Sequence, residues 1–169
     1  MDHESLNDPS DPNDPNDPND PNDPNDPNDM RIEFQRRVDA IEEAYEFMLA
    51  YAAQGVAGDS GAGSQIREFL TRAAGALADL GGVVTAIVER EGIEPSDRYR
   101  AFAAVVDRDA RDSLAAFELV LAQPSVSSQI VDNLNASVHV RALLTDLFLI
   151  DEILKVRLKP DPTYNTVDT

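Results

Sequence analysis

Apolar residues recur at steps of three and four along the middle of the chain, which is the spacing of one face of an α-helix. Four segments carry this pattern. The apolar positions of the first two are Phe34, Val38, Ile41, Tyr45, Met48 and Ala52, and then Ile66, Leu70, Ala73, Leu77, Leu80, Val84 and Ile87. Those of the third and fourth are Tyr99, Phe102, Val106, Ala110, Leu114, Phe117 and Leu121, and then Val126, Ile130, Leu134 and Val138. A repeat near 3.5 residues is typical of helices that pack together in bundles.

Residues that end helices lie between these four segments. A glycine-rich stretch, Gly55–Gly63, follows the first segment, and Ser64 is placed to cap the second helix. Gly92 closes the second helix, and Pro95 precedes the third. Gln123-Pro124-Ser125 separates the third helix from the fourth. The sequence therefore predicts four helices of about 24 to 30 residues joined by short loops.

The whole chain is predicted to be all-α, with one folded domain between two loose ends. Residues 30–155 are expected to form an antiparallel up-down four-helix bundle. The leader, 1–29, repeats the triplet Asp-Pro-Asn six times and has almost no apolar residue to bury, so it is predicted to be disordered. Prolines and turn formers in residues 156–169 predict a disordered tail.

The repeat ends directly before a methionine, Met30, which raises the question of where the native chain starts. A perfect triplet repeat is what a repetitive DNA tract read upstream of the true start would encode, so we hypothesise that Met30 is the native initiator. Calcium capture is the alternative interpretation, because Asp and Asn carry oxygen ligands. Residues spaced along an extended chain do not converge on one ion, which argues against it.

Charge and composition exclude several classes of function. The net charge is −18, and residues 30–169 keep 22 acidic residues against 14 basic ones, a net charge of −8. With no basic stripe, nucleic-acid binding and attachment to anionic membranes have no electrostatic support. No apolar stretch reaches the ~20 residues that a membrane span needs. The absence of cysteine excludes disulfides and thiolate chemistry. We expect a cytoplasmic protein that carries no cofactor.

The first half of the fourth segment is unusually polar. At helical spacing, Asp132, Asn135, His139 and Asp146 share one face. One interpretation is a pocket in which His139 acts as acid, base or ligand, oriented by Asp132 or Asn135. The other is a solvated face or a buried hydrogen-bond network. His139 is the only histidine of the domain and Ala136 stands three residues before it, so the Glu-x-x-His pairs of di-iron bundles are missing.

The second half of the fourth segment is apolar on more than one face. A helix that is apolar nearly all round is normally covered all round, whereas a four-helix monomer covers one side of each helix. The sequence therefore predicts a self-association interface made of Leu147, Leu149, Ile150, Ile153 and Leu154. The alternative is a broad core stripe with Leu149 or Ile150 exposed.

Two further features leave alternatives open. The acidic patch of the first helix, Asp39, Glu42, Glu43 and Glu46, is interpreted as a solvated face, as a partner of arginines on the third helix, or as a site for a basic protein. Glycines that interrupt the second helix, Gly75, Gly81 and Gly82, indicate a close helix contact or a kink, or else room for a ligand.

Function is predicted only by class. We expect a non-enzymatic helical-bundle interaction protein that forms a homo-oligomer and serves as an adaptor, scaffold or regulatory subunit, with a further protein as a possible partner. The alternative is a small-molecule- or metal-binding bundle, either a binding protein or an enzyme, that uses the polar face around His139. An exposed His139 with no adjoining cavity would count against that alternative.

Overall fold

The computed structural model of the chain describes residues 27–59 and 64–157. These residues form six helices and no strand, namely α1 (Pro27–Ala52), α2 (Gln65–Leu77), α3 (Leu80–Arg90), α4 (Ser96–Leu121), α5 (Ser128–Asn135) and α6 (Val138–Arg157). The all-α prediction is confirmed. The predicted disordered leader and tail fall mostly outside the described residues, although α1 begins at Pro27 and α6 continues to Arg157.

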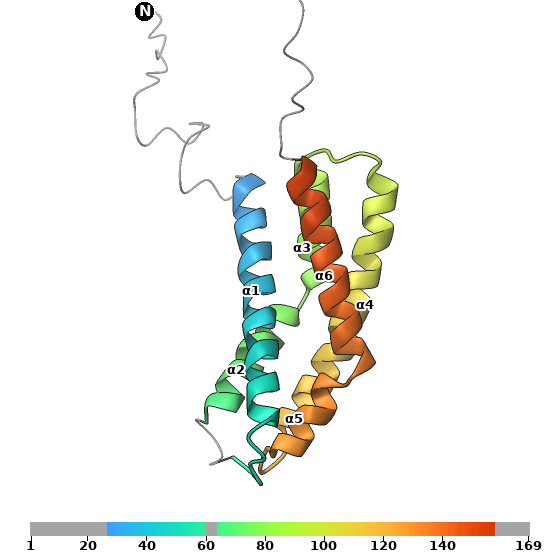
Figure 1. Cartoon of the computed structure of the whole chain (residues 1–169). Coiled ribbons are helices and arrows are strands. Elements are labelled where there is room, and N and C mark those ends of the chain that lie inside the picture. The colour runs from blue at the N-terminus through green and yellow to red at the C-terminus, as the bar shows by residue number, and fades with distance from the viewer. Residues whose placement is uncertain (1–26, 60–63, 158–169) are drawn as a thin grey trace, which may run out of the picture.

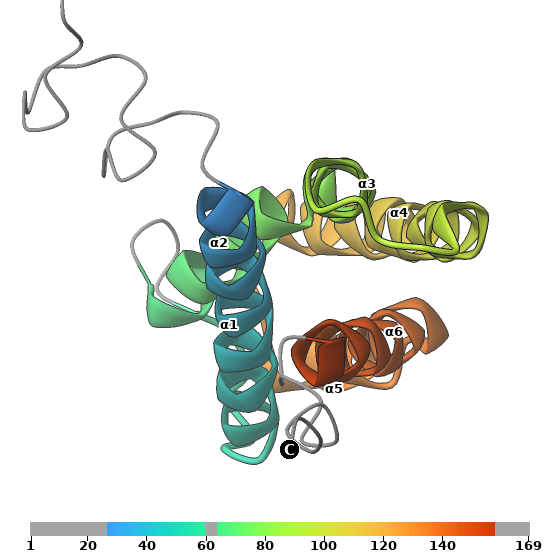
Figure 2. The ribbon, with the colours of Figure 1, turned by 90° about the horizontal axis from the view of Figure 1, so that it is seen from above.

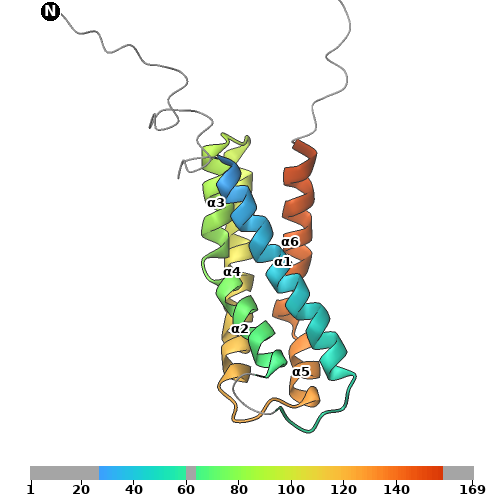
Figure 3. The same cartoon turned by 90° about the vertical axis from the view of Figure 1, so that its left-hand side faces the viewer.

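The helices lie along four columns and alternate in direction (Figure 1). α1 runs from one end of the molecule to the other, α2 and α3 return, α4 descends again, and α5 and α6 return. From the side, α1 crosses the other columns obliquely (Figure 3), and it packs on α2, α3 and α5. The predicted number of four helices is wrong, because the second and the fourth predicted helix are each divided in two.

The second predicted helix is interrupted at Ala78 and Asp79. Ala78 is extended, and Asp79 has a φ of 55°, in the left-handed region. α2 and α3 meet there at 44°. Just beyond the bend, Gly81 touches α4 so closely that an added Cβ would overlap Asp107 and lie 2.8 Å from the carbonyl oxygen of Ala103. Both the kink and the close helix contact that the glycines indicated are therefore present.

The fourth predicted helix is interrupted at Ala136 and Ser137. α5 starts after Ser127, whose Oγ accepts a hydrogen bond of 3.3 Å from the amide of Ile130. The helix ends at Asn135, and α6 begins at Val138. Asn and Ser side chains compete with helical hydrogen bonds, so Asn-Ala-Ser is a favourable place for a break. The break separates polar residues that a continuous helix would place on one face.

The core lies between the columns and follows the predicted stripes closely. Every predicted core position of the second segment, from Ile66 to Ile87, is at most 2% exposed. Phe34, Val38 and Met48 of the first segment are also buried. The prediction that Val138 faces inward is wrong, because its side chain is 69% exposed. The break before α6 places Val138 on the side of the helix that faces away from the core.

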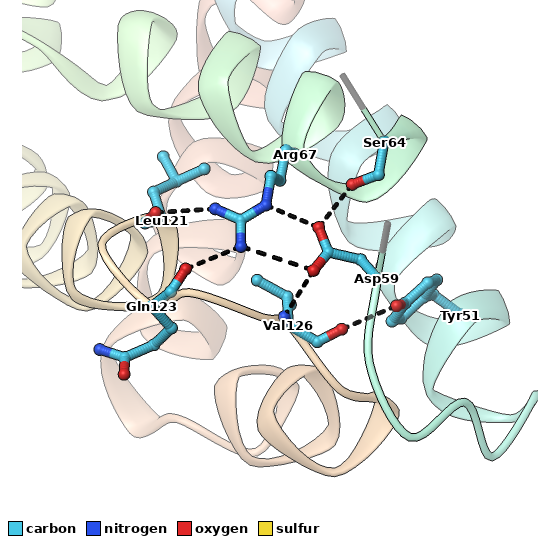
Figure 4. A network of polar contacts seen from close by, with 7 residues as sticks. All are labelled: Tyr51, Asp59, Ser64, Arg67, Leu121, Gln123 and Val126. Atoms are coloured by element: carbon cyan, nitrogen blue, oxygen red, sulfur yellow. Dashed lines mark hydrogen bonds and ion pairs between the residues drawn. The ribbon is translucent and has the colours of Figure 1, made fainter. Parts of the chain in front are cut away.

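A buried ion pair holds together three chain segments at one end of the molecule (Figure 4). The carboxylate of Asp59, whose side chain is only 1% exposed, accepts hydrogen bonds from Arg67 Nε at 2.6 Å, Ser64 Oγ at 2.7 Å and the amide of Val126 at 2.8 Å. Ser64 stands at the N-cap of α2, but its hydroxyl makes no capping bond to the helix, so the predicted side-chain cap is wrong.

The same ion pair reaches the end of α4. Arg67 donates to the carbonyl oxygens of Leu121, at 2.9 Å, and of Gln123, at 2.7 Å. Tyr51 at the end of α1 donates its hydroxyl to the carbonyl of Val126 at 2.8 Å. Asp59 and Arg67 therefore join the α1–α2 loop, the first turn of α2 and the α4–α5 connection, which are far apart in sequence.

Candidate functional site

The outward side of α6 carries large exposed apolar side chains that no other helix of the described residues covers. We call this surface the outer strip of α6, and it consists of Val138, Phe148, Leu149, Ile153 and Val156. Phe148 is 54% exposed and Leu149 is 50% exposed. Viewed from above, α4 lies on one side of α6 and α1 on another, and no helix within residues 27–59 and 64–157 covers the remaining side (Figure 2). Burying such a strip would be favourable by about 25 cal/mol for each Å² of apolar area removed from water.

The outer strip exists because α6 has two apolar stripes. Leu147, Ile150 and Leu154 are at most 2% exposed and pack inside the subunit. Their predicted place in a self-association interface is therefore wrong. Leu149 and Ile153 follow the same spacing with a shift of about half a turn, and they face outward as predicted. Sequence spacing identified both stripes but not which of them the subunit would bury.

Two grooves flank the outer strip, an apolar one towards α4 and one of mixed polarity towards α1. Towards the start of α4, a groove of about 370 Å³ is lined by Tyr99 and Phe102 together with Leu149 and Ile153. Towards α1, a groove of about 550 Å³ runs past Phe148. Its other lining residues include Tyr45 and Leu144, together with the polar Arg141 and Thr145. The strip and its grooves form a ridge between two hollows, a shape that suits the docking of another helix.

The predicted polar face of the fourth segment does not come together as a pocket. Asp132 is exposed at the end of α5, while Asn135 is 6% exposed and its amide finds no hydrogen-bond partner among the described residues. The side chain of His139 is 49% exposed, with Nδ1 3.6 Å from the Asp112 carboxylate of α4, and it lines none of the grooves named here. The break between α5 and α6 is the physical reason why these polar residues do not form one pocket.

The fourth member of that face, Asp146, meets another carboxyl group. It lies against Asp109 of α4. Partial burial raises the pKa of Asp146, and a hydrogen bond with Asp109 and the charge of Asp109 raise it further. His139 and Asp146 thus both face α4, where each meets an acidic side chain. Sequence reasoning did not identify Asp112 and Asp109 as the neighbours of His139 and Asp146, because they lie far away in the chain.

Replacing Asp146 by asparagine is expected to stabilise the protein at pH 7 by about 0.5–1.5 kcal/mol, the net worth of one hydrogen bond. The amide removes a negative charge and can donate to Asp109. Because the folded-state pKa of Asp146 is raised, its carboxyl disfavours folding as the pH rises through that pKa, and the advantage of asparagine should vanish below about pH 4.

Urea unfolding followed by circular dichroism at pH 7 and pH 3.5 measures this difference. Asp112→Asn is the matched control, because Asp112 is half exposed and stands on the same helix as Asp109. Its effect should stay within about 0.5 kcal/mol at both pH values. A variant of Asp146 that is equally stable or less stable than the native protein at pH 7 would contradict the proposed contact.

The acidic patch of α1 is balanced by α2 and not by the arginines of the third segment. Glu43 pairs with Arg72 of α2 at 2.7 Å. Asp39 accepts a hydrogen bond from Gln35 of its own helix at 2.8 Å. Burial raises the pKa of Glu42, and the neighbouring acids, among them Asp39 and Asp151 of α6, raise it further. The alternative in which arginines of α4 balance this patch is therefore wrong.

Comparisons with known families, characterised proteins and solved structures give no match to this chain.

Within residues 27–59 and 64–157, no three His, Asp or Glu side chains are grouped so that they could hold a metal ion. In the same part of the chain, no single helix is long and apolar enough to cross a membrane, and only α2 and α3 taken together across their bend meet that criterion. The outer strip of α6 is the feature that stands out from an ordinary protein surface.

Proposed function

We propose that this protein is a non-enzymatic helical-bundle interaction protein, a self-associating adaptor, scaffold or regulatory subunit of the cytoplasm. Its helices are interpreted as an antiparallel up-down four-helix bundle in which two of the four members are broken. The single observation that carries the proposal is the exposure of Phe148 and Leu149 side by side between an apolar groove and a groove of mixed polarity. Contiguous exposed apolar surface of this kind marks interaction sites in soluble proteins.

The partner that we propose first is a second copy of the chain, and a further protein partner would dock on the assembled oligomer. The polar-face alternative around His139 has no support in the geometry, since His139 is half exposed and adjoins none of the grooves. An acidic chain without a basic stripe also gives no reason to propose a nucleic acid or a membrane as partner.

Phe148→Asp is expected to weaken self-association at least tenfold, because an aromatic side chain at the centre of an interface commonly contributes 2 kcal/mol or more. Folding should be unchanged, since Phe148 is 54% exposed in the subunit. Size-exclusion chromatography with light scattering, at several protein concentrations, measures the change.

Leu119→Asp is the matched control for that variant. Leu119 is 65% exposed on α4, so the control removes a comparable exposed apolar side chain away from the outer strip. It should leave the association constant unchanged. Equal effects of the two substitutions would mean that association is non-specific, and the proposal would fail.

A further inference from the structure

Two charges of opposite sign lie about three helical turns apart on the outward side of α6. Arg141 and Glu152 are both exposed, and neither forms a salt bridge with another described residue, although the charge of Glu152 also acts on Lys155 one turn further along. They are eleven residues apart, about three helical turns, so they point to the same side. Lys155 and Asp151 are different, because they pair with each other within the helix.

The residues between these two charges continue one outward seam. Arg141, Thr145, Phe148 and Glu152 follow at steps of four, three and four, and all four are exposed. This is the spacing by which one helix lies along another. The seam therefore carries one positive end, one negative end, and a centre made of a small and a large side chain.

We infer that two copies of the chain pair through α6 in antiparallel orientation about a twofold axis that passes between Thr145 and Phe148. This inference rests on the self-association proposed above and adds its geometry. In a twofold interface, residue i faces residue j and residue j faces residue i. With the axis at this point, Arg141 faces Glu152 of the second copy, twice, and Thr145 faces Phe148.

Charge complementarity is what selects a second copy as the occupant. A parallel pairing would place Arg141 against Arg141 and Glu152 against Glu152, which is repulsive. A strongly basic partner would find a single acid on the seam and would meet Arg141 as well. A like copy in antiparallel orientation satisfies both charges and covers Phe148 and Leu149 at the same time.

Charge reversal in the full chain tests the arrangement. Arg141→Glu and Glu152→Arg should each weaken the dimer about tenfold or more at low salt, because each turns two attractions into two repulsions. The double variant, R141E together with E152R, should return to within about threefold of the native dissociation constant. An equimolar mixture of the two single variants should form a heterodimer, since each charge then meets its opposite.

The outcomes separate this inference from the proposal on which it rests. Because both residues are exposed, thermal unfolding of each variant should match that of the native protein, and this is checked by circular dichroism. Single variants that bind as tightly as the native chain, or a double variant that stays weak, would overturn the antiparallel geometry while self-association through Phe148 stands. A native chain that is monomeric at every concentration would overturn both.

Discussion

Replacing Asp59 by asparagine is expected to reduce the free energy of unfolding by about 3 kcal/mol or more, because it leaves the Arg67 guanidinium without its counter-charge in a nearly closed site. The side chains of Asp59 and Arg67 are 1% and 14% exposed. The substitution also turns one acceptor oxygen of the carboxylate into a donor amide. The new side-chain NH₂ group would face other hydrogen-bond donors, among them the backbone N–H of Val126.

The ion pair between Glu43 and Arg72 supplies the matched control. Its Oε2 and Nη2 atoms are 2.7 Å apart, close to the 2.6 Å of the buried pair, but its side chains are more than half exposed. Glu43→Gln should therefore cost at most about 1 kcal/mol. Urea unfolding of both variants measures the two costs. Similar costs would show that burial of Asp59 is unimportant to the fold.

The effect of Asp59 should also depend on pH. Hydrogen bonds from Arg67, and then from Ser64 and the amide of Val126, hold the pKa of Asp59 well below its usual range. A group with a lowered folded-state pKa contributes stability above its unfolded pKa of about 3.9 and loses it as the pH falls. The difference between the native protein and Asp59→Asn should thus be full at pH 7 and shrink below about pH 4.

Gly81→Val is expected to destabilise the protein by about 3 kcal/mol, at the upper end of the usual cost of overpacking. A side chain at this position would press on the backbone of α4, because even a Cβ lies 2.8 Å from the carbonyl oxygen of Ala103. The two helices can relieve the overlap only by moving apart, which opens the core around Val84 and Val106.

Gly75→Val is the control for that substitution. Gly75 lies in α2, and an added Cβ there would meet nothing within 4 Å. Because valine is a slightly better helix former than glycine, this variant should be neutral or stabilising by a few tenths of a kcal/mol. Thermal unfolding of the two variants gives the comparison. A well-tolerated Gly81→Val would contradict the close contact between α3 and α4.

The sequence predicted the helical class and most of the core, because both depend on local spacing. The stripe from Ile66 to Ile87 is buried throughout. The joints at Gly55 and Gly92 also appear where they were expected, each with a positive φ. Such signals lie within a few residues of the feature that they specify, so a single sequence is enough to find them.

The two helix breaks could not be predicted, because tertiary contacts decide them. Asp79 adopts a left-handed conformation where α3 turns onto α4, and Gly81 makes that approach possible. The sequence indicated a kink near Gly81 but not a separate helix. At Asn135 the chain gave only the weak preference of Asn and Ser for non-helical conformations.

The candidate site was predicted in part for the same reason. Periodicity showed that the second half of the last helix is apolar on two sides, and Leu149 and Ile153 do face outward. Whether Leu147 and Ile150 or their neighbours would face the core depended on the position of α4. The pairing of Asp59 with Arg67 likewise required knowledge of how a loop folds back onto the end of α4.

Sedimentation equilibrium of the full chain over a wide range of concentrations is the most direct test of self-association through α6. The proposed interface predicts a weight-average mass that rises from 18.5 kDa towards twice that value as the concentration increases. A mass that stays at 18.5 kDa over the whole range would contradict the proposal, because the outer strip would then remain open to solvent.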